Sequence, residues 1–122
     1  MSKILIIEDE ESIRRVLKKV LIDENQSFKI IEACDGVQAI DMVKSNKLDL
    51  ILCDIKMPKK DGIEVLQFLM SDYPEIPVIM ISGHGDLETA VQSMRLGAFD
   101  YISKPPDLNR LLNSVRAALK NN

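Results

Sequence analysis

Two hydrophobic periods alternate along the chain. Short, nearly continuous apolar runs are typical of strands covered on both faces, and they predict strands over residues 4–7, 28–34, 50–53, 77–81 and 99–102. After each run, apolar residues recur at steps of three and four, which is the spacing of an amphipathic helix. These stripes begin at Ile13, Val37, Ile63, Leu87 and Leu108. The pattern therefore predicts a chain of alternating strands and helices.

Polar and glycine residues mark the expected ends of several elements. Asp35 and Gly36 predict a turn before the second helix. Gly97 is expected to cap the fourth helix at its carboxyl end, and Asp107 to cap the last helix at its amino end. The boundaries leave no linker or low-complexity segment, so we expect one domain over residues 1–122.

Alternating strands and helices favour an α/β fold with a parallel sheet, helices on both faces and right-handed crossovers. We expect a flavodoxin-like (βα)5 domain with five strands in the order 2-1-3-4-5. Ligands of such sheets bind beyond the carboxyl ends of the strands, where the strand order reverses. In this order, that place lies between the first and third strands.

Chemically active side chains stand where the predicted strands end. Glu8 and Asp9 follow the first strand, Asp54 the third, Ser82 the fourth and Lys104 the fifth. Carboxylates that are brought together repel one another and shift one another's pKa, which is costly without a metal or a reaction. We therefore predict a site for a hard divalent cation, with chemistry on Asp54.

Composition and charge narrow the function classes. A hydrophobic content of 46% in 122 residues suffices for one core, and a net charge of −3 gives no basic footprint for nucleic acid or an anionic membrane. No apolar run approaches the roughly 20 residues that span a bilayer. Cys34 and Cys53 lie in apolar runs without metal-ligand spacing, so both are predicted to be buried free thiols. We expect a cytoplasmic protein.

Short motifs in a fixed order carry a resemblance to a known family. They are Glu8-Asp9, Asp54 with Met57-Pro58 and Asp61-Gly62, Ser82-Gly83, Gly97-Ala98 leading to Tyr101, and Lys104-Pro105. Together they resemble the receiver domain of two-component response regulators, over the whole length of the chain. The stretch from Arg95 to Tyr101, with Asp107, resembles the NtrC/NtrX type that precedes a transcriptional output module.

The resemblance implies a phosphorylation switch rather than a metabolic enzyme. Asp54 would accept a phosphoryl group from a phosphohistidine on a sensor histidine kinase or phosphotransfer protein. Ser82 and Lys104 would contact the phosphoryl oxygens, and Tyr101 would be the aromatic switch of the output face. That face, formed by the fourth helix, fifth strand and fifth helix, would bind the output partner or a second copy of the chain.

The resemblance also implies Mg²⁺ as cofactor. Its ligands would be Asp9, Asp54 and the backbone carbonyl of Lys56, with Glu8 acting through water. Glu8 departs from the family, which more often has Asp there, and the extra methylene alters the reach of the carboxylate. Lys104-Pro105 is expected to form a cis peptide, and the family more often has a bulky apolar residue at Pro106.

Rival functions lack their required residues. A flavin or nucleotide binder needs a Gly/Ser/Thr-rich phosphate loop after the first strand, where residues 8–11 are all acidic. No P-loop motif is present. A haloacid-dehalogenase-like phosphatase resembles a pattern with a second Asp where this chain has Lys56. The alternative that stays open is a receiver-like interaction module that is not phosphorylated, although the phosphorylation residues are all retained.

Overall fold

The computed structural model describes residues 2–57, 61–83, 87–104 and 107–120. Pro105, and with it the predicted cis peptide, lies outside the described residues, as do Pro106 and the single histidine, His84, for which the sequence suggests an exposed loop position. No helix in the described ranges has both the length and the apolar character needed to cross a membrane.

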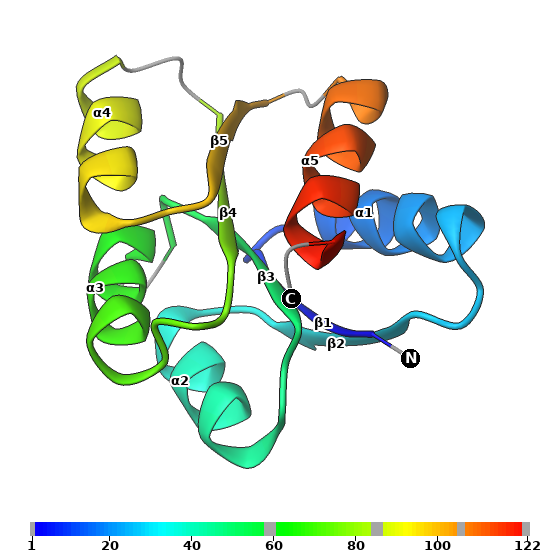
Figure 1. Ribbon diagram of the computed structural model, residues 1–122, viewed down its shortest axis with the longest axis horizontal. Helices are drawn as coiled ribbons and strands as arrows, with labels where there is room; N and C mark the ends of the chain where they lie inside the picture. The colour runs from blue at the N-terminus through cyan, green and yellow to red at the C-terminus, as the bar shows by residue number, and fades with distance from the viewer. Residues whose placement is uncertain (1, 58–60, 84–86, 105–106, 121–122) are drawn as a thin grey trace.

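The chain forms a five-stranded parallel sheet in the order β2-β1-β3-β4-β5, as predicted (Figure 1). The strands are β1 (Lys3–Ile7), β2 (Lys29–Ala33), β3 (Leu50–Asp54), β4 (Val78–Ser82) and β5 (Asp100–Ser103). The helices are α1 (Glu11–Glu24), α2 (Gly36–Ser45), α3 (Gly62–Asp72), α4 (Leu87–Leu96) and α5 (Leu108–Lys120). Helices α1 and α5 cover one face of the sheet, and α2, α3 and α4 cover the other (Figure 1).

The continuous apolar runs are explained by a core on each face of the sheet. In β1, Leu5 and Ile7 belong to the core shared with α2 and α3, whereas Ile4 and Ile6 belong to the core shared with α1 and α5. Successive side chains of a strand point to opposite faces, so a strand covered on both sides needs apolar residues at every position. Both faces of the central strands are therefore buried.

The element ends agree closely with the sequence prediction. Asp107 accepts hydrogen bonds from the backbone N–H groups of Asn109 and Arg110, at 3.0 and 3.2 Å, which confirms it as the cap of α5. Gly97 follows α4 with a φ of +111°, a conformation that favours glycine. The Asp35-Gly36 prediction was only partly right. Asp35 accepts from the N–H of Gln38 at 2.8 Å and caps α2, and Gly36 is already the first residue of that helix.

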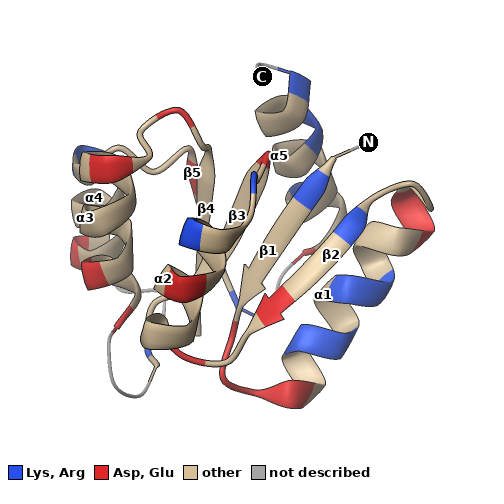
Figure 2. Ribbon diagram, turned by 90° about the horizontal axis from the view of Figure 1, so that it is seen from below, with Lys and Arg blue, Asp and Glu red and all other residues tan. Residues whose placement is uncertain are grey.

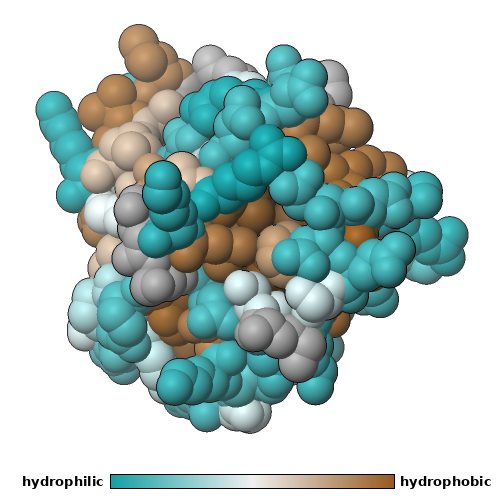
Figure 3. All heavy atoms as spheres, turned by 45° about the vertical axis from the view of Figure 1, so that its right-hand side comes forward, coloured by the Kyte–Doolittle hydropathy of each residue, from teal (hydrophilic) through white to brown (hydrophobic). Residues whose placement is uncertain are grey.

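One prediction of burial was wrong, and one apolar stripe is unexpectedly exposed. Cys34 is exposed, because β2 ends at Ala33 and the thiol lies in the connection to α2, whereas Cys53 is buried as predicted. Most of the apolar stripe of α4 is exposed, since Leu87, Val91 and Met94 are 76%, 40% and 47% exposed. Single apolar side chains are common on protein surfaces. Figure 3, which brings the α5 side of Figure 1 forward, also shows apolar patches among hydrophilic side chains.

Candidate functional site

The sheet brings the predicted acidic residues together at the carboxyl ends of β1 and β3. These strands are neighbours, with Ile7 opposite Cys53, so Glu8 and Asp9 emerge beside Asp54. One carboxylate oxygen from each of the three acids lies within 4.8 Å of the others. Glu8 and Asp54 are buried, at 1% and 6% exposed, and Asp9 is exposed. Figure 2 shows the acidic segment that leaves β1 and leads into α1.

Lys104 is the cation of this site. It follows β5, and its backbone N–H donates to the carbonyl of Ser82 at 2.6 Å. Its Nζ lies 2.5 Å from Oε1 of Glu8 and 3.3 Å from Oδ1 of Asp54. Lys104 therefore contacts both acids, and its contact with Glu8 is the shorter. The longer Glu side chain reaches the ammonium at the position where the family more often has Asp.

Burial and neighbouring charge set the protonation of the site. Burial raises the pKa of Glu8 to about 7, and the nearby Asp54 carboxylate adds to this, although hydrogen bonds from Lys104 and from the N–H of Glu10 act in the opposite direction. Burial alone would lower the pKa of Lys104, but its contacts with Glu8 and Asp54 raise it on balance. The ammonium therefore stays charged and compensates the acids beside it.

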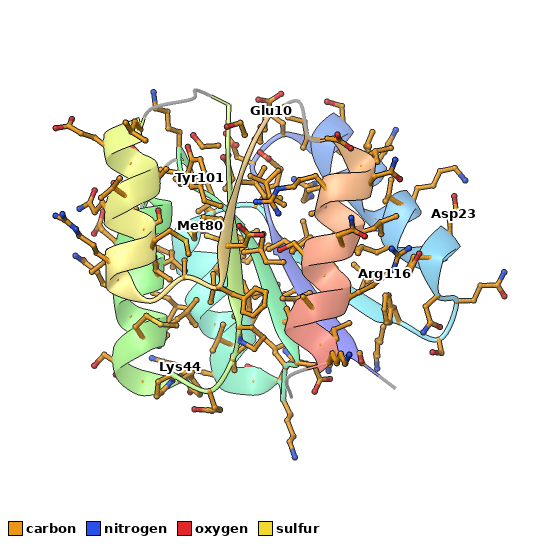
Figure 4. The ribbon with its side chains drawn as sticks, turned by 45° about the horizontal axis from the view of Figure 1, so that its top comes forward. Glu10, Asp23, Lys44, Met80, Tyr101 and Arg116 are labelled. Atoms are coloured by element: carbon orange, nitrogen blue, oxygen red, sulfur yellow. The ribbon has the colours of Figure 1, made fainter. Side chains whose placement is uncertain are left out.

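Ser82 and Lys56 lie at the same end of the sheet, whereas Tyr101 lies further back along β5. Ser82 is buried at the last position of β4 and is opposite Ser103 of β5. Tyr101 of β5 is half-buried beside Met80 of β4, on the side of the sheet that faces α3 and α4 (Figure 4). Lys56 is exposed, two residues beyond β3.

Gly62 has a structural role that the sequence did not reveal. A Cβ at this position would collide with the backbone carbonyl oxygen of Asp54 and lie 2.7 Å from the Cα of Ile55. The N–H of Gly62 also donates to the carbonyl of Ile55 at 2.6 Å. The first turn of α3 therefore packs directly on the backbone of Asp54, which only glycine allows. The Asp61-Gly62 motif contains this residue, but spacing alone does not indicate the contact.

Arg14 also reaches the site without a sequence signal. It lies in the polar pair Arg14-Arg15 of α1, a position typical of a solvated helix face. Its Nη1 nevertheless donates to the carbonyl of Glu8 at 2.8 Å. Nothing in the spacing separates it from Arg15, which is exposed.

Three carboxylates and one ammonium at the carboxyl ends of the strands suit two kinds of chemistry. Carboxylate oxygens are the ligands that hard divalent cations such as Mg²⁺ prefer, so the donor set fits that cation. A buried carboxylate with an adjacent ammonium can also act as a positioned nucleophile toward an anionic group.

Comparison with known proteins shows the family of the chain. Residues 4–116 match the response regulator receiver domain family. The chain is 38% identical over 117 residues to a putative NtrX-like response regulator of Rickettsia typhi, and 38% identical over 119 residues to the nitrogen assimilation regulatory protein NtrX of Azorhizobium caulinodans. It is 38% identical over 120 residues to the transcriptional regulatory protein CpxR of Escherichia coli.

The matches cover most of this chain but only part of those relatives. They include 94%, 96% and 98% of this chain, and 24%, 26% and 50% of the three relatives. The chain thus spans a quarter to a half of their length.

Solved structures agree with the fold. The receiver domain of NtrX from Brucella abortus matches with a TM-score of 0.90 and 36% identity, over 98% of this chain and 99% of that one. A Francisella response regulator receiver domain matches with a TM-score of 0.90 and 29% identity, over 99% and 98% of the two chains. Receiver domains are signalling switches of two-component systems that generally bind Mg²⁺ at an acidic pocket. The chain belongs to the response regulator receiver domain family.

Proposed function

We propose that this chain is a phosphorylation switch in which Asp54 accepts a phosphoryl group from a phosphohistidine on a sensor histidine kinase or phosphotransfer protein. One observation carries the proposal. Asp54 is buried at the end of β3. One of its carboxylate oxygens lies within 4.8 Å of a carboxylate oxygen of Glu8 and of Asp9, and Oδ1 lies 3.3 Å from the Lys104 ammonium. Such clustering is costly, and a phosphoryl-transfer site is a reason to maintain it.

The chemistry requires little beyond placement. An oxygen of Asp54 attacks phosphorus as the N–P bond of the phosphohistidine breaks, and the imidazole nitrogen keeps that electron pair and takes up a proton. The product is an acyl phosphate on Asp54. In-line transfer of this kind depends mainly on positioning and on stabilising the equatorial oxygens. Lys104 and Ser82, at the ends of β5 and β4, would donate hydrogen bonds to those oxygens.

Mg²⁺ would be held by Asp9, Asp54 and the carbonyl of Lys56, with Glu8 acting through water. The bound cation would neutralise charge on the phosphoryl oxygens. Glu8 has a second task in this chain, because its Oε1 accepts from Lys104 at 2.5 Å and its Oε2 from the N–H of Glu10 at 3.2 Å. Glu8 would thus keep the ammonium at the site before transfer.

The assignment to Asp54 is tested by intact-mass measurement after incubation with acetyl phosphate and Mg²⁺. We expect a gain of one phosphoryl group in the wild type and in Asp61→Asn, and none in Asp54→Asn or without a divalent cation. Asp61 is a matched control because it is an acid near the site that caps α3, a task that Asn also performs.

Two outcomes would contradict the proposal. An equal gain in wild type and Asp54→Asn would place the acceptor elsewhere. No gain in any variant, from either acetyl phosphate or a phosphorylated histidine donor, would favour a receiver-like interaction module that is not phosphorylated.

The switch would be transmitted to the face formed by α4, β5 and α5. Phosphorylation would draw Ser82 toward Asp54 and let Tyr101 turn further inward. This face already exposes Leu87, Val91 and Met94, and exposed apolar side chains that lie on one helix suit a protein partner. Dimerisation or binding of the output partner would take place here.

The transmission is tested by NMR of the protein with and without beryllofluoride. We expect chemical-shift changes at Tyr101 and along α4 when Asp54 is saturated, and no change in α2, which lies on the same face of the sheet but toward its other edge (Figure 1). If Tyr101 and α4 do not respond at saturation, this face is not the output surface.

The wider role follows from the relatives. We propose that residues 1–122 form one cytoplasmic receiver unit that regulates transcription through a downstream module or partner, as the names of the NtrX and CpxR relatives suggest. Any contact with DNA would belong to that module, because this chain has a net charge of −3.

A further inference from the structure

The side chain of Arg14 crosses from α1 to the loop that carries Glu8 and Asp9. Its Nη1 donates to the carbonyl of Glu8 at 2.8 Å and approaches that of Asp9 at 3.4 Å. Its Nε lies 3.3 Å from a carboxylate oxygen of Glu32 in β2. The side chain is only 18% exposed. The guanidinium therefore joins the acidic loop to a neighbouring strand.

The same loop is held on its other side by backbone groups. The N–H of Glu8 donates to the carbonyl of Ala33 in β2 at 3.0 Å, and the N–H of Glu10 donates to Oε2 of Glu8 at 3.2 Å. Glu8 is thus fixed through its own N–H, and Arg14 fixes its carbonyl. Both peptide groups that set the direction of its side chain have a partner.

We propose that Arg14 is a positioning residue for the cation site, holding the Glu8 and Asp9 backbone so that their carboxylates converge on Asp54 before a cation binds. This inference rests on the proposed function. The three carboxylates repel one another, and without an anchor the exposed Asp9 would turn toward water. A forked guanidinium can hold a carbonyl and a carboxylate at once, which an ammonium cannot do in the same geometry.

Glu32 completes the arrangement. It lies opposite Ile6 in the sheet register, so its place is set by the β1–β2 pairing. One carboxylate oxygen faces Arg14 and the other lies 3.5 Å from Nζ of Lys18. Glu32 thus orients the guanidinium, and its removal should act in the same direction as removal of Arg14, with a smaller effect.

The direction in which the Mg²⁺ affinity changes when Arg14 is replaced distinguishes a positioning role from a purely electrostatic one. Removing a cation near a metal site strengthens the local negative potential, which by itself tightens Mg²⁺ binding. Loss of the positioning of the Glu8 and Asp9 carboxylates weakens Mg²⁺ binding. Interactions that orient metal ligands typically change metal affinity by about 10–100-fold, which exceeds the screened effect of one partly exposed charge.

The experiment is isothermal titration of the whole chain with Mg²⁺ at 25 °C. We expect Arg14→Met to raise the Kd about tenfold, Arg14→Lys to recover part of the loss, and Glu32→Gln to raise the Kd less than Arg14→Met does. Arg15→Met is the matched control, because Arg15 is the next residue, carries the same charge and pairs only with the exposed Glu11 among the described residues. It should bind as the wild type does. An unchanged or lower Kd in Arg14→Met would overturn the proposal.

Amide hydrogen exchange in the cation-free protein tests the loop itself. We expect faster exchange at Glu10 in Arg14→Met than in Arg15→Met, with exchange in β3 and β4 unchanged, and equal rates at Glu10 in the two variants would also overturn the proposal. A general loss of stability would instead accelerate exchange throughout the sheet. Failure of the proposed function would give a different result. In that case Asp9→Ala would bind Mg²⁺ as the wild type does, regardless of any effect of Arg14 on the loop.

Discussion

Helices α4 and α5 flank the same strand, β5, yet they relate to the sheet in opposite ways (Figure 1). In α5, the residues Leu111, Val115 and Ala118 are fully buried. In α4, all of whose residues the structure describes, only Ser93 is fully buried, and Leu87 is 76% exposed. Both helices have an apolar stripe in the sequence. The stripe predicts a helix in each case, but only in α5 does it predict which side is buried.

The polar contacts of α4 and α5 also differ. Arg110 of α5 donates two hydrogen bonds to Asp100 of β5, at 2.6 and 2.9 Å, and Ser114 donates to the same carboxylate at 2.7 Å. In α4, the buried hydroxyl of Ser93 has no hydrogen-bond partner among the residues that the structure describes. We conclude that α5 is firmly packed on the sheet, whereas α4 is suited to change its contacts.

Truncation of one leucine in each helix should give the largest contrast. Leu111→Ala removes a fully buried side chain and should lower the free energy of unfolding by about 2–5 kcal/mol. Leu87→Ala should change it by no more than about 0.5 kcal/mol, because that side chain is exposed. Urea unfolding of the two variants at the same pH measures the difference. Equal losses would mean that α4 is packed as firmly as α5.

The Asp100 contacts should make part of the stability of the α5 face depend on pH. Hydrogen bonds from Arg110 chiefly, and also from Ser114 and the N–H of Tyr101, hold the pKa of Asp100 down at about 2 although its partial burial acts to raise it. A pKa lowered in the folded state stabilises the protein above the unfolded value near 3.9. That contribution is lost as the pH falls through 2.

Asp100→Asn should therefore be less stable than wild type at pH 6, with the difference shrinking between pH 4 and pH 2. The loss should be about 1 kcal/mol, since solvent screens this half-exposed pair. Thermal unfolding across this pH range is the measurement, with Asp23→Asn, an exposed acid of α1, as control. A difference from wild type that does not vary with pH would show that the charge of Asp100 is not the cause.

A pair of serine substitutions should change the free energy of unfolding by similarly small amounts, but with opposite signs. Ser93→Ala removes a buried hydroxyl without a described partner and should stabilise the protein by up to about 1 kcal/mol. Ser114→Ala removes the donor to Asp100 and should destabilise it by about 1 kcal/mol. Chemical denaturation resolves the two. Destabilisation by Ser93→Ala would indicate that its hydroxyl is satisfied, for example by water.

The sequence predicted the sheet, its strand order and the clustering of the site residues, for a physical reason. Strands covered on both faces must be apolar throughout, so the place where polarity returns, at Glu8 and after Cys53, marks the edge of the core. In a parallel sheet these edges coincide, and the acids must therefore meet. The alternation of the pattern was enough to predict the parallel sheet and the meeting of the acids, whereas the strand order was taken from the flavodoxin-like fold.

Other features depend on contacts that the pattern does not contain. The apolar stripe of α4 is largely exposed, because periodicity determines which residues share a helical face but not what that face packs against. The pairing of Lys104 with Glu8 depends on side-chain length, and the role of Arg14 on which of two adjacent arginines faces the loop. In each case the deciding fact is a three-dimensional distance.

The joint between Gly62 and Asp54 has a mechanical consequence. Because the first turn of α3 packs directly on the backbone of Asp54, that side of the site leaves no space into which the backbone can shift. If Asp54 is phosphorylated as proposed, the resulting movement cannot be accommodated on that side without a collision. We expect the movement to occur instead toward the ends of β4 and β5. A single glycine would then determine the direction in which the proposed change spreads through the domain.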